Sequence, residues 1–239
     1  MPRVLVDVGN TSVTWCMEYD DDPGQYTQPE SLSTQRLLAG TALLPDSWHF
    51  SNLIVASVVP KIDELLRRHK DADLYFVSHQ DFPEITLRVD HPEEVGVDRI
   101  VNVYAAERVL KRRPLVVVDF GTATTFDVLD ADGGYLGGVI APGLALSRDI
   151  LSERTAKLPL IELFRPQRMI GRNTVNAMAS GLILATEAMV NGVVREIEGE
   201  LKQAVGLVLT GGYVDLIQVS HEHKIVKQLC FEGLKQIGG

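Results

Sequence analysis

The sequence predicts an α/β protein built from two similar lobes. The first observation is a repeated pattern, in which an apolar strand ends in an aspartate that is followed by a turn of glycine and hydroxyl residues. One copy is Asp7-Val-Gly-Asn-Thr11 and the other is Asp119-Phe-Gly-Thr-Ala-Thr-Thr125. The second observation is that predicted strands alternate with amphipathic helices. The third is length, because 239 residues suffice for one large domain or two small ones.

In the first half, Arg3 to Val8 and Ser12 to Glu18 predict a hairpin around the first turn, because β-branched residues precede it. Polar residues 20–28 contain a Pro-Gly turn signal and predict an exposed loop. The next segments predict three strands and two helices. In chain order they are strand Leu53 to Val59, helix Pro60 to Arg68, strand Leu74 to Ser78, strand Ile85 to Val89, and a helix from Arg99 to about Leu110.

The second half begins at Pro114 and predicts a three-stranded meander around the second turn. Its strands are Leu115 to Phe120, Thr124 to Leu129 and Tyr135 to Ile140. Four further elements are expected after it: helices Leu144 to Ser152 and Asn173 to Gln203, strand Leu207 to Thr210, and a terminal helix near Glu232 to Ile237.

Composition narrows the class of protein. A formal net charge of −9 argues against nonspecific nucleic-acid binding, which requires a basic face. No apolar stretch approaches the roughly 20 residues that a membrane-spanning helix needs, and the N-terminus runs directly into the first strand without a signal peptide. We therefore expect a cytoplasmic protein with no membrane partner. The two cysteines, Cys16 and Cys230, have neither metal-site nor disulfide spacing and are expected to be reduced and buried.

The repeated turn predicts a phosphate and cation site. Its glycine lets the backbone approach an anion, the threonine hydroxyls are donors, and the aspartate would hold a cation directly or through water. A single turn of this kind is weak evidence, because Asp and Gly dominate ordinary turns for conformational reasons. Two copies about one small domain apart favour a nucleotide held between two lobes.

Gly96-Val-Asp98-Arg99 has two interpretations. Asp98 is either an N-cap with Arg99 as a solvated neighbour, or a base that takes a proton from a substrate hydroxyl while Arg99 binds a carboxylate with its planar fork. Local sequence favours the capping interpretation. Gly171-Arg-Asn-Thr174 precedes the long helix, so Asn173 or Thr174 is equally well explained as a helix cap.

With these pieces in order, the sequence resembles the type III pantothenate kinases, members of the superfamily that includes acetate and sugar kinases, actin and Hsp70. The resemblance spans nearly the whole chain. Its anchors are Asp7-Val-Gly-Asn-Thr11, Pro92-Glu-Glu-Val-Gly-Val-Asp-Arg99, Val118-Asp-Phe-Gly-Thr-Ala-Thr125, Gly137-Gly-Val-Ile-Ala-Pro-Gly143, Arg154-Thr-Ala-Lys-Leu-Pro159, Gly171-Arg-Asn-Thr174 and Thr210-Gly-Gly212.

The resemblance implies a fold and an activity. The fold is two ribonuclease-H-like lobes, residues 1–113 and 114–239, with mixed β-sheets flanked by helices as in actin-like ATPases, and ATP in the cleft between them. The activity is ATP-dependent phosphorylation of pantothenate, the first step of coenzyme A synthesis. Family members are typically homodimers, so a homodimer is expected, with the long helix after Thr174 as a candidate contact.

The resemblance also assigns roles residue by residue. It makes Asp98 the general base, Arg99 the ligand of the pantothenate carboxylate, and Gly96, Val97 and Thr174 substrate contacts. Asp119 matches a position that binds a monovalent cation, K⁺ or NH₄⁺, and Thr122 an ATP contact. The residues around the ATP phosphates and their Mg²⁺ would be Asp7, Val8, Gly9, Asn10, Thr11, Ser12, Val13 and Thr14.

The chain departs from the family pattern near the substrate. Val89 replaces a common tyrosine, His91 replaces an asparagine, and the segment from Ser78 to Ile85 lacks a glycine-rich stretch. Three alternatives to pantothenate kinase therefore stay open: a noncatalytic regulatory relative, a kinase for another hydroxylated acid, and a phosphatase that uses the same fold. Arg99 beside Asp98 favours an acidic substrate that bears a hydroxyl.

Overall fold

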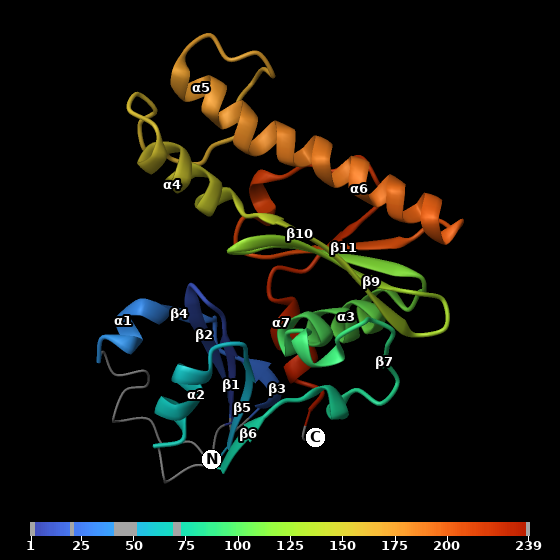
Figure 1. Cartoon of the computed structure of the whole chain (residues 1–239). Helices are drawn as coiled ribbons and strands as arrows, with labels where there is room; N and C mark the ends of the chain where they lie inside the picture. Colours follow the sequence, from blue (N-terminus) through green and yellow to red (C-terminus); the bar gives the residue numbers. More distant parts are fainter. Residues whose placement is uncertain (1–2, 20–21, 41–51, 69–72, 238–239) are drawn as a thin grey trace. The chain divides into compact units, whose positions relative to one another are not determined.

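The computed structural model describes residues 3–19, 22–40, 52–68 and 73–237, and these residues form an α/β fold (Figure 1). They make two compact units. The first contains the chain up to Glu84, His91–Ala105 and the segment from Cys230, and the second contains Ile85–Asp90 and Ala106–Leu229. The expected domain limits, 1–113 and 114–239, stay a prediction.

The first unit has a mixed sheet with the strand order β3-β2-β1-β5-β6, and β4 pairs with β2. β1 and β2 are antiparallel, whereas β1, β5 and β6 run parallel to one another. The strands are β1 (Arg3–Val8), β2 (Ser12–Tyr19), β3 (Asp22–Tyr26), β4 (Glu30–Ser33), β5 (Asn52–Ser57) and β6 (Asp73–Phe76). The α-helices with residues in this unit are α1 (Thr34–Leu38), α2 (Pro60–Leu66), α3 (Val97–Leu110), which continues into the second unit, and α7 (Leu229–Leu234).

The core of the first unit lies where β1 and β5 meet α2. Val4, Val6 and Val55 are completely buried there, together with Ile62 and Leu66 of the helix. Continuous apolar runs of this kind are typical of strands covered on both faces. The predicted hairpin and the strands β5 and β6 are confirmed to within about two residues.

The prediction of a loop at residues 20–28 is wrong for residues 22–26, which form strand β3. Residues 20 and 21 lie outside the described residues. β3 pairs with β2, with Tyr26 opposite Glu18. It lies at the edge of the sheet, where proline is tolerated because one side of the strand needs no partner. Tertiary pairing thus overrides the local turn signal.

The second unit has a mixed sheet with the order β12-β11-β8-β9-β10-β7. The predicted meander is confirmed, since β8–β9 and β9–β10 are antiparallel pairs, while β11 runs parallel to β8. The strands are β7 (Thr86–Leu87), β8 (Leu115–Phe120), β9 (Ala123–Leu129), β10 (Gly134–Pro142), β11 (Gly206–Thr210) and β12 (Lys224–Ile225).

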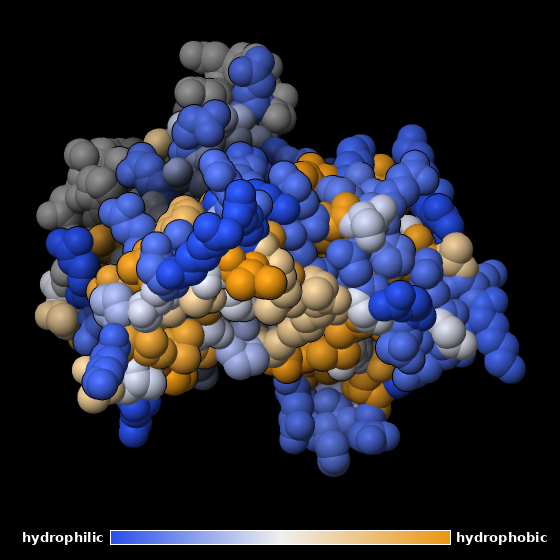
Figure 2. All heavy atoms as spheres, turned by 90° about the horizontal axis from the view of Figure 1, so that it is seen from above, coloured by the Kyte–Doolittle hydropathy of each residue, from blue (hydrophilic) through white to orange (hydrophobic). Residues whose placement is uncertain are grey.

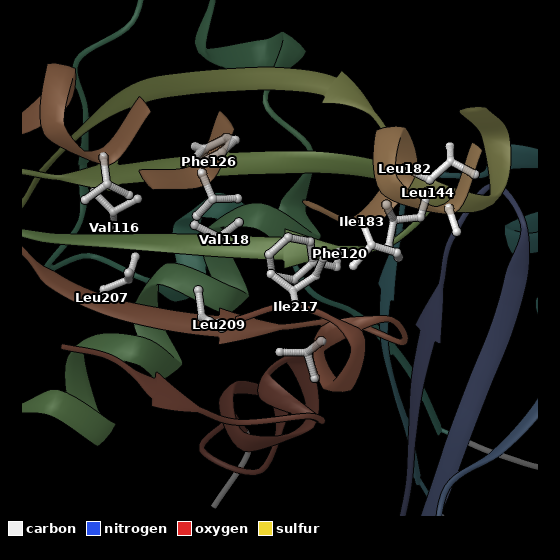
Figure 3. Close-up of a cluster of buried hydrophobic side chains, with 14 of the residues drawn as sticks. Val116, Val118, Phe120, Phe126, Leu144, Leu182, Ile183, Leu207, Leu209 and Ile217 are labelled. Carbon is white, nitrogen blue, oxygen red and sulfur yellow. The ribbon is translucent and has the colours of Figure 1, made fainter. Parts of the chain in front are cut away.

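Helices cover one face of this sheet. α4 (Leu144–Arg154), α5 (Thr174–Ala179), a π-helical turn (Ser180–Leu184) and α6 (Ala185–Leu201) supply apolar side chains to a shared core. Figure 3 shows that Val118 and Phe120 of the central strand lie among these residues, with Leu144, Leu182 and Ile183 grouped at one end.

The residues from Thr174 to Leu201 form one long helical run, as predicted for Asn173 to Gln203. This run is long and apolar enough to cross a membrane by length and composition, with a mean hydropathy of 1.5 over its most apolar window. The expectation that no apolar stretch approaches the length of a membrane-spanning helix is therefore wrong for this run. Core helices of soluble proteins meet the same criterion, and here Val190 and Val194 are buried in the core of the second unit.

Candidate active site

The first glycine turn is held by hydrogen bonds within the first unit. The Gly9 amide donates to the Ser12 carbonyl at 2.9 Å, and the buried Thr34 hydroxyl donates to the Gly9 carbonyl at 2.7 Å. The Thr34 amide donates to the Thr11 carbonyl at 2.9 Å. The Gly9 amide is thus occupied within the turn, so donors to a phosphate would come from the exposed tip, Asn10 and Thr11.

The side chains that flank this turn differ in exposure. Val8 and Val13 are completely buried in the core of the first unit, whereas Ser12 and Thr14 are half-buried. The Thr14 hydroxyl donates to the Ser31 hydroxyl at 3.2 Å. The two valines therefore fix the position of the turn, and their side chains are not available to a nucleotide.

The Gly96 segment lies at the same edge of the first sheet as this turn. The Val58 amide, just beyond β5, donates to the Val8 carbonyl at 3.1 Å. A Cβ atom on Gly96 would be 3.3 Å from Cγ1 of Val58. The carboxyl ends of parallel strands are where ligands bind in α/β sheets. The structure thus brings the two segments that the resemblance assigned to phosphate and substrate to one edge.

Asp98 lies in the first turn of α3, which begins at Val97. Its Oδ1 accepts a hydrogen bond from the Arg99 amide at 2.8 Å, and the same amide donates to the Gly96 carbonyl at 3.2 Å. Burial raises the pKa of Asp98, and the Arg99 amide and guanidinium partly offset this effect. A carboxylate with a raised pKa is a better proton acceptor than an ordinary surface aspartate.

A cavity of about 360 Å³ lies beside this residue in the first unit. Its walls are the segments that follow β5 and β6 and the loop Glu93–Val97. We call residues 91–99 the substrate loop, because they contain the segment that the resemblance assigns to the substrate. The base candidate therefore directly follows two residues, Gly96 and Val97, that line a concave site of the size that small ligands use.

The second glycine turn lies in the same arrangement of strands as the first, although it is one residue shorter. In the antiparallel pairs, Asp7 lies opposite Thr14 and Asp119 lies opposite Thr125. Each aspartate also has a parallel neighbour on its other side, β5 in the first unit and β11 in the second. The predicted repeat is therefore present in the order and direction of the strands.

Glycines surround the Asp119 carboxylate within the second unit. A Cβ atom on Gly211 would lie 2.4 Å from Asp119 Oδ1, and one on Gly121 would lie 3.5 Å from it. Gly211 has a φ of +95°, a conformation that favours glycine. Gly143 approaches the turn so closely that a Cβ atom there would lie 2.3 Å from the Thr122 carbonyl oxygen.

The remaining predicted residues are exposed. Thr122 is at the tip of the second turn, and Thr174 is the first residue of α5. The helix cap is Asn173, whose side-chain oxygen accepts a hydrogen bond from the Asn176 amide at 2.8 Å. The capping role, which the sequence left open between two residues, thus belongs to Asn173.

Among the described residues, no group of three or more His, Cys, Asp or Glu side chains could hold a metal ion. The buried, free thiols of Cys16 and Cys230 agree with the expectation from sequence.

Sequence reasoning missed two residues that shape this region. Thr34 binds the first turn, and His79 contacts the substrate loop through the Val95 carbonyl at 2.9 Å. Both contacts join segments that are 16 to 25 residues apart. No local pattern in the sequence signals such a contact.

The family model for type III pantothenate kinase matches residues 3–196. The chain belongs to the type III pantothenate kinase family. A type III pantothenate kinase from Dehalococcoides mccartyi is 38% identical over 98% of this chain and 96% of its own length. One from Deinococcus radiodurans is 36% identical over 91% of this chain and 87% of its own length. The resemblance drawn from the motifs is therefore confirmed.

Solved structures confirm the predicted fold of this family member. A candidate Baf family transcriptional activator from Campylobacter jejuni aligns with a TM-score of 0.66 and 21% identity, covering 98% of this chain and 96% of its own. An archaeal actin homolog aligns with a TM-score of 0.51 and 14% identity over 99% and 98%. At such identities the likeness shows the actin-like fold alone.

Proposed function

We propose that this chain is an ATP-dependent kinase that phosphorylates the hydroxyl of pantothenate to give 4'-phosphopantothenate, the first step of coenzyme A synthesis. One observation carries the proposal. In a chain of this family, Asp98 combines a raised pKa with a position beside Arg99, and it directly follows Gly96 and Val97, which line a cavity at the sheet edge that also holds the first glycine turn. This combination supports a base next to an anion-binding group.

In the proposed mechanism Asp98 accepts the proton of the pantothenate hydroxyl. The hydroxyl oxygen forms a bond to the γ-phosphorus of ATP, the bond to the β-γ bridging oxygen breaks, and ADP leaves. Arg99 binds the pantothenate carboxylate with its planar fork, which orients the hydroxyl. Gly96 and Val97 form part of the cavity wall, and the lack of a side chain at Gly96 leaves room for the substrate.

Asp7 and the exposed residues Asn10 and Thr11 would hold the ATP phosphates and Mg²⁺ at the first turn. The ion neutralises charge on the phosphate oxygens when bound. This assignment is supported by the exposed tip of the turn and by the carboxylate at the end of β1. The Thr34 contacts keep the turn rigid.

Asp119 is proposed to bind K⁺ or NH₄⁺, with Thr122 as an ATP contact and Thr174 as a substrate contact. The glycines around Asp119 support the cation role, because side chains there would occupy the space next to its carboxylate.

We also propose a cytoplasmic homodimer that has no nucleic-acid or membrane partner. The net charge of −9 supports the absence of nucleic-acid binding. Figure 2 shows orange apolar side chains gathered among blue polar ones on one face. In the second unit the exposed apolar residues include Ile140, Leu146, Ile150, Leu160, Met169, Ile170 and Val175. Exposed apolar groups on α4, α5 and the segment between them favour contact with a second copy.

The test is ATP-dependent phosphorylation of pantothenate by the purified protein with Mg²⁺, with and without K⁺ or NH₄⁺. Activity that requires the monovalent cation is expected. Absence of product with every cation would contradict the proposal and leave another hydroxylated acid, for which Val89 and His91 are the distinguishing positions, or a regulatory role. Light scattering that gives only a monomer at micromolar concentration would contradict the homodimer.

A further inference from the structure

We propose that His79 is a positioning residue for the substrate loop. This inference rests on the proposed function and deepens it. His79 Nε2 lies 2.9 Å from the Val95 carbonyl oxygen. Because a carbonyl only accepts, Nε2 carries the proton and donates it. The bond joins the segment after β6 to the loop that leads into Gly96 and Asp98, one wall of the cavity to the other.

The backbone of His79 is a fixed point in the first unit. It begins a short 3₁₀ turn, and Ser78 and Asp81 form a capping box around it, with the Ser78 amide donating to Asp81 Oδ2 at 2.7 Å. At the other end, Phe82 is 1% exposed and packs edge-on against Tyr104 of α3, with ring centroids 4.8 Å apart. The imidazole therefore projects from an anchored turn.

The substrate loop has mainly local bonds of its own. The Glu94 amide donates to the His91 carbonyl at 3.1 Å, and the Val95 amide donates to the Pro92 carbonyl at 3.3 Å. These bonds shape the turn but do not tie it to the sheet. The His79 bond ties it to the anchored turn that follows β6, and it fixes the plane of the Val95–Gly96 peptide, which immediately precedes the segment with the base.

A change in this peptide plane moves Gly96, and with it the start of α3 where Asp98 lies. Misplacement of a reacting group by 1 Å can cost about 10²-fold in rate. Loss of a single hydrogen bond at a partly exposed position permits a smaller average displacement. We expect His79→Asn to lower kcat/KM for pantothenate about tenfold, with KM for ATP within about twofold of the wild-type value because the first glycine turn keeps its own bonds.

Two variants of this histidine make the test specific. His79→Gln can place an amide donor near the position of Nε2 and should restore most of kcat/KM, whereas the shorter His79→Asn cannot reach Val95. A matched control is His223→Ala, which removes a bond of the same kind in the second unit, from His223 Nδ1 at 2.7 Å from the His221 carbonyl oxygen. This control should leave kcat/KM for pantothenate and KM for ATP unchanged.

Hydrogen exchange separates this inference from the proposed function. Amides 93–99 should exchange faster in His79→Asn than in the wild type or His79→Gln, whatever the substrate is. If the wild type fails to phosphorylate pantothenate while this difference is present, the proposed function is wrong and the role of His79 in the loop stands. Equal exchange in all three proteins, or equal kcat/KM for the Asn and Gln variants of an active enzyme, would overturn the positioning role.

Discussion

Gly96→Ala tests whether the position of the Asp98 carboxylate matters for turnover. A Cβ atom at this position would be 2.4 Å from Asp98 Oδ1 and 3.3 Å from Val58 Cγ1. Ordinary contacts begin near 3.4 Å, so the oxygen must move by about 1 Å. The movement breaks the 2.8 Å bond from the Arg99 amide, although that amide keeps its second acceptor, the Gly96 carbonyl.

The cost in stability should be small. The clash involves the end of a flexible side chain, and Gly96 is not among the glycines of positive φ, so alanine adds no backbone strain. Loss of one hydrogen bond costs about 0.5–1.5 kcal/mol, and the reduced freedom of the unfolded chain offsets roughly 0.4–1 kcal/mol of it. The free energy of unfolding should therefore change by less than about 1.5 kcal/mol.

Activity should respond far more strongly, with kcat for pantothenate falling about 10²-fold, since a misplaced base loses most of its effect. Steady-state kinetics measures kcat, and urea unfolding of the same preparation measures the free energy of unfolding. Gly199→Ala is the matched control, because no atom lies within 4 Å of a Cβ there and the residue is exposed in α6. If Gly96→Ala keeps kcat within about threefold of the wild type, the reasoning about Asp98 is refuted.

Further predictions concern protons and buried groups. Because burial raises the pKa of Asp98, kcat/KM for pantothenate should fall as pH drops through a pKa above the ordinary value of 3.8; a pH profile measures this. Asp98→Asn should lower kcat about 10²–10⁴-fold with nucleotide binding nearly intact. It should also raise Tm at pH 7, and the gain should vanish below pH 3.8, because a raised folded pKa makes ionisation destabilising. Burial raises the pKa of Cys16 to about 12, so thiol reagents should modify it only on unfolding. Tyr135→Phe should cost about 1–3 kcal/mol in urea unfolding, because buried Asp127 loses a donor at 2.7 Å.

The sequence predicts most of the sheet framework because apolar runs are a local signal. The central strands β1, β5, β8 and β11 have buried, β-branched residues and start or end within a residue or two of their predicted bounds. Strand β3 escaped prediction because it pairs with the preceding strand β2 although its own residues are polar and contain a Pro-Gly turn signal. The π-helical turn at Ser180–Leu184 was also invisible, since it interrupts a helix without a change in apolar pattern.

The candidate site was predictable in its positions but not in its electrostatics. Each of the two aspartates near a strand end follows from the same local pattern, a buried apolar strand that leads into a glycine turn. The burial that raises the pKa of Asp98 depends on packing around the start of α3, which the sequence pattern does not contain. For the same reason the capping interpretation looked better locally, although Asp98 accepts the amide of its neighbour rather than that of a residue further into the helix.

The two glycine turns share a backbone plan but differ where a ligand would lie. In the first turn Gly9 bonds to Ser12, three residues on, and the tip is exposed. In the second, Gly121 bonds to Ala123, only two residues on, and Gly143 and Gly211 approach it so closely that neither could carry a side chain without displacing backbone or the Asp119 carboxylate. A longer open tip suits phosphate groups, whereas the second turn places glycines around a carboxylate. The two copies of the repeat therefore present different surroundings to a ligand, an exposed tip in the first and a carboxylate next to glycines in the second.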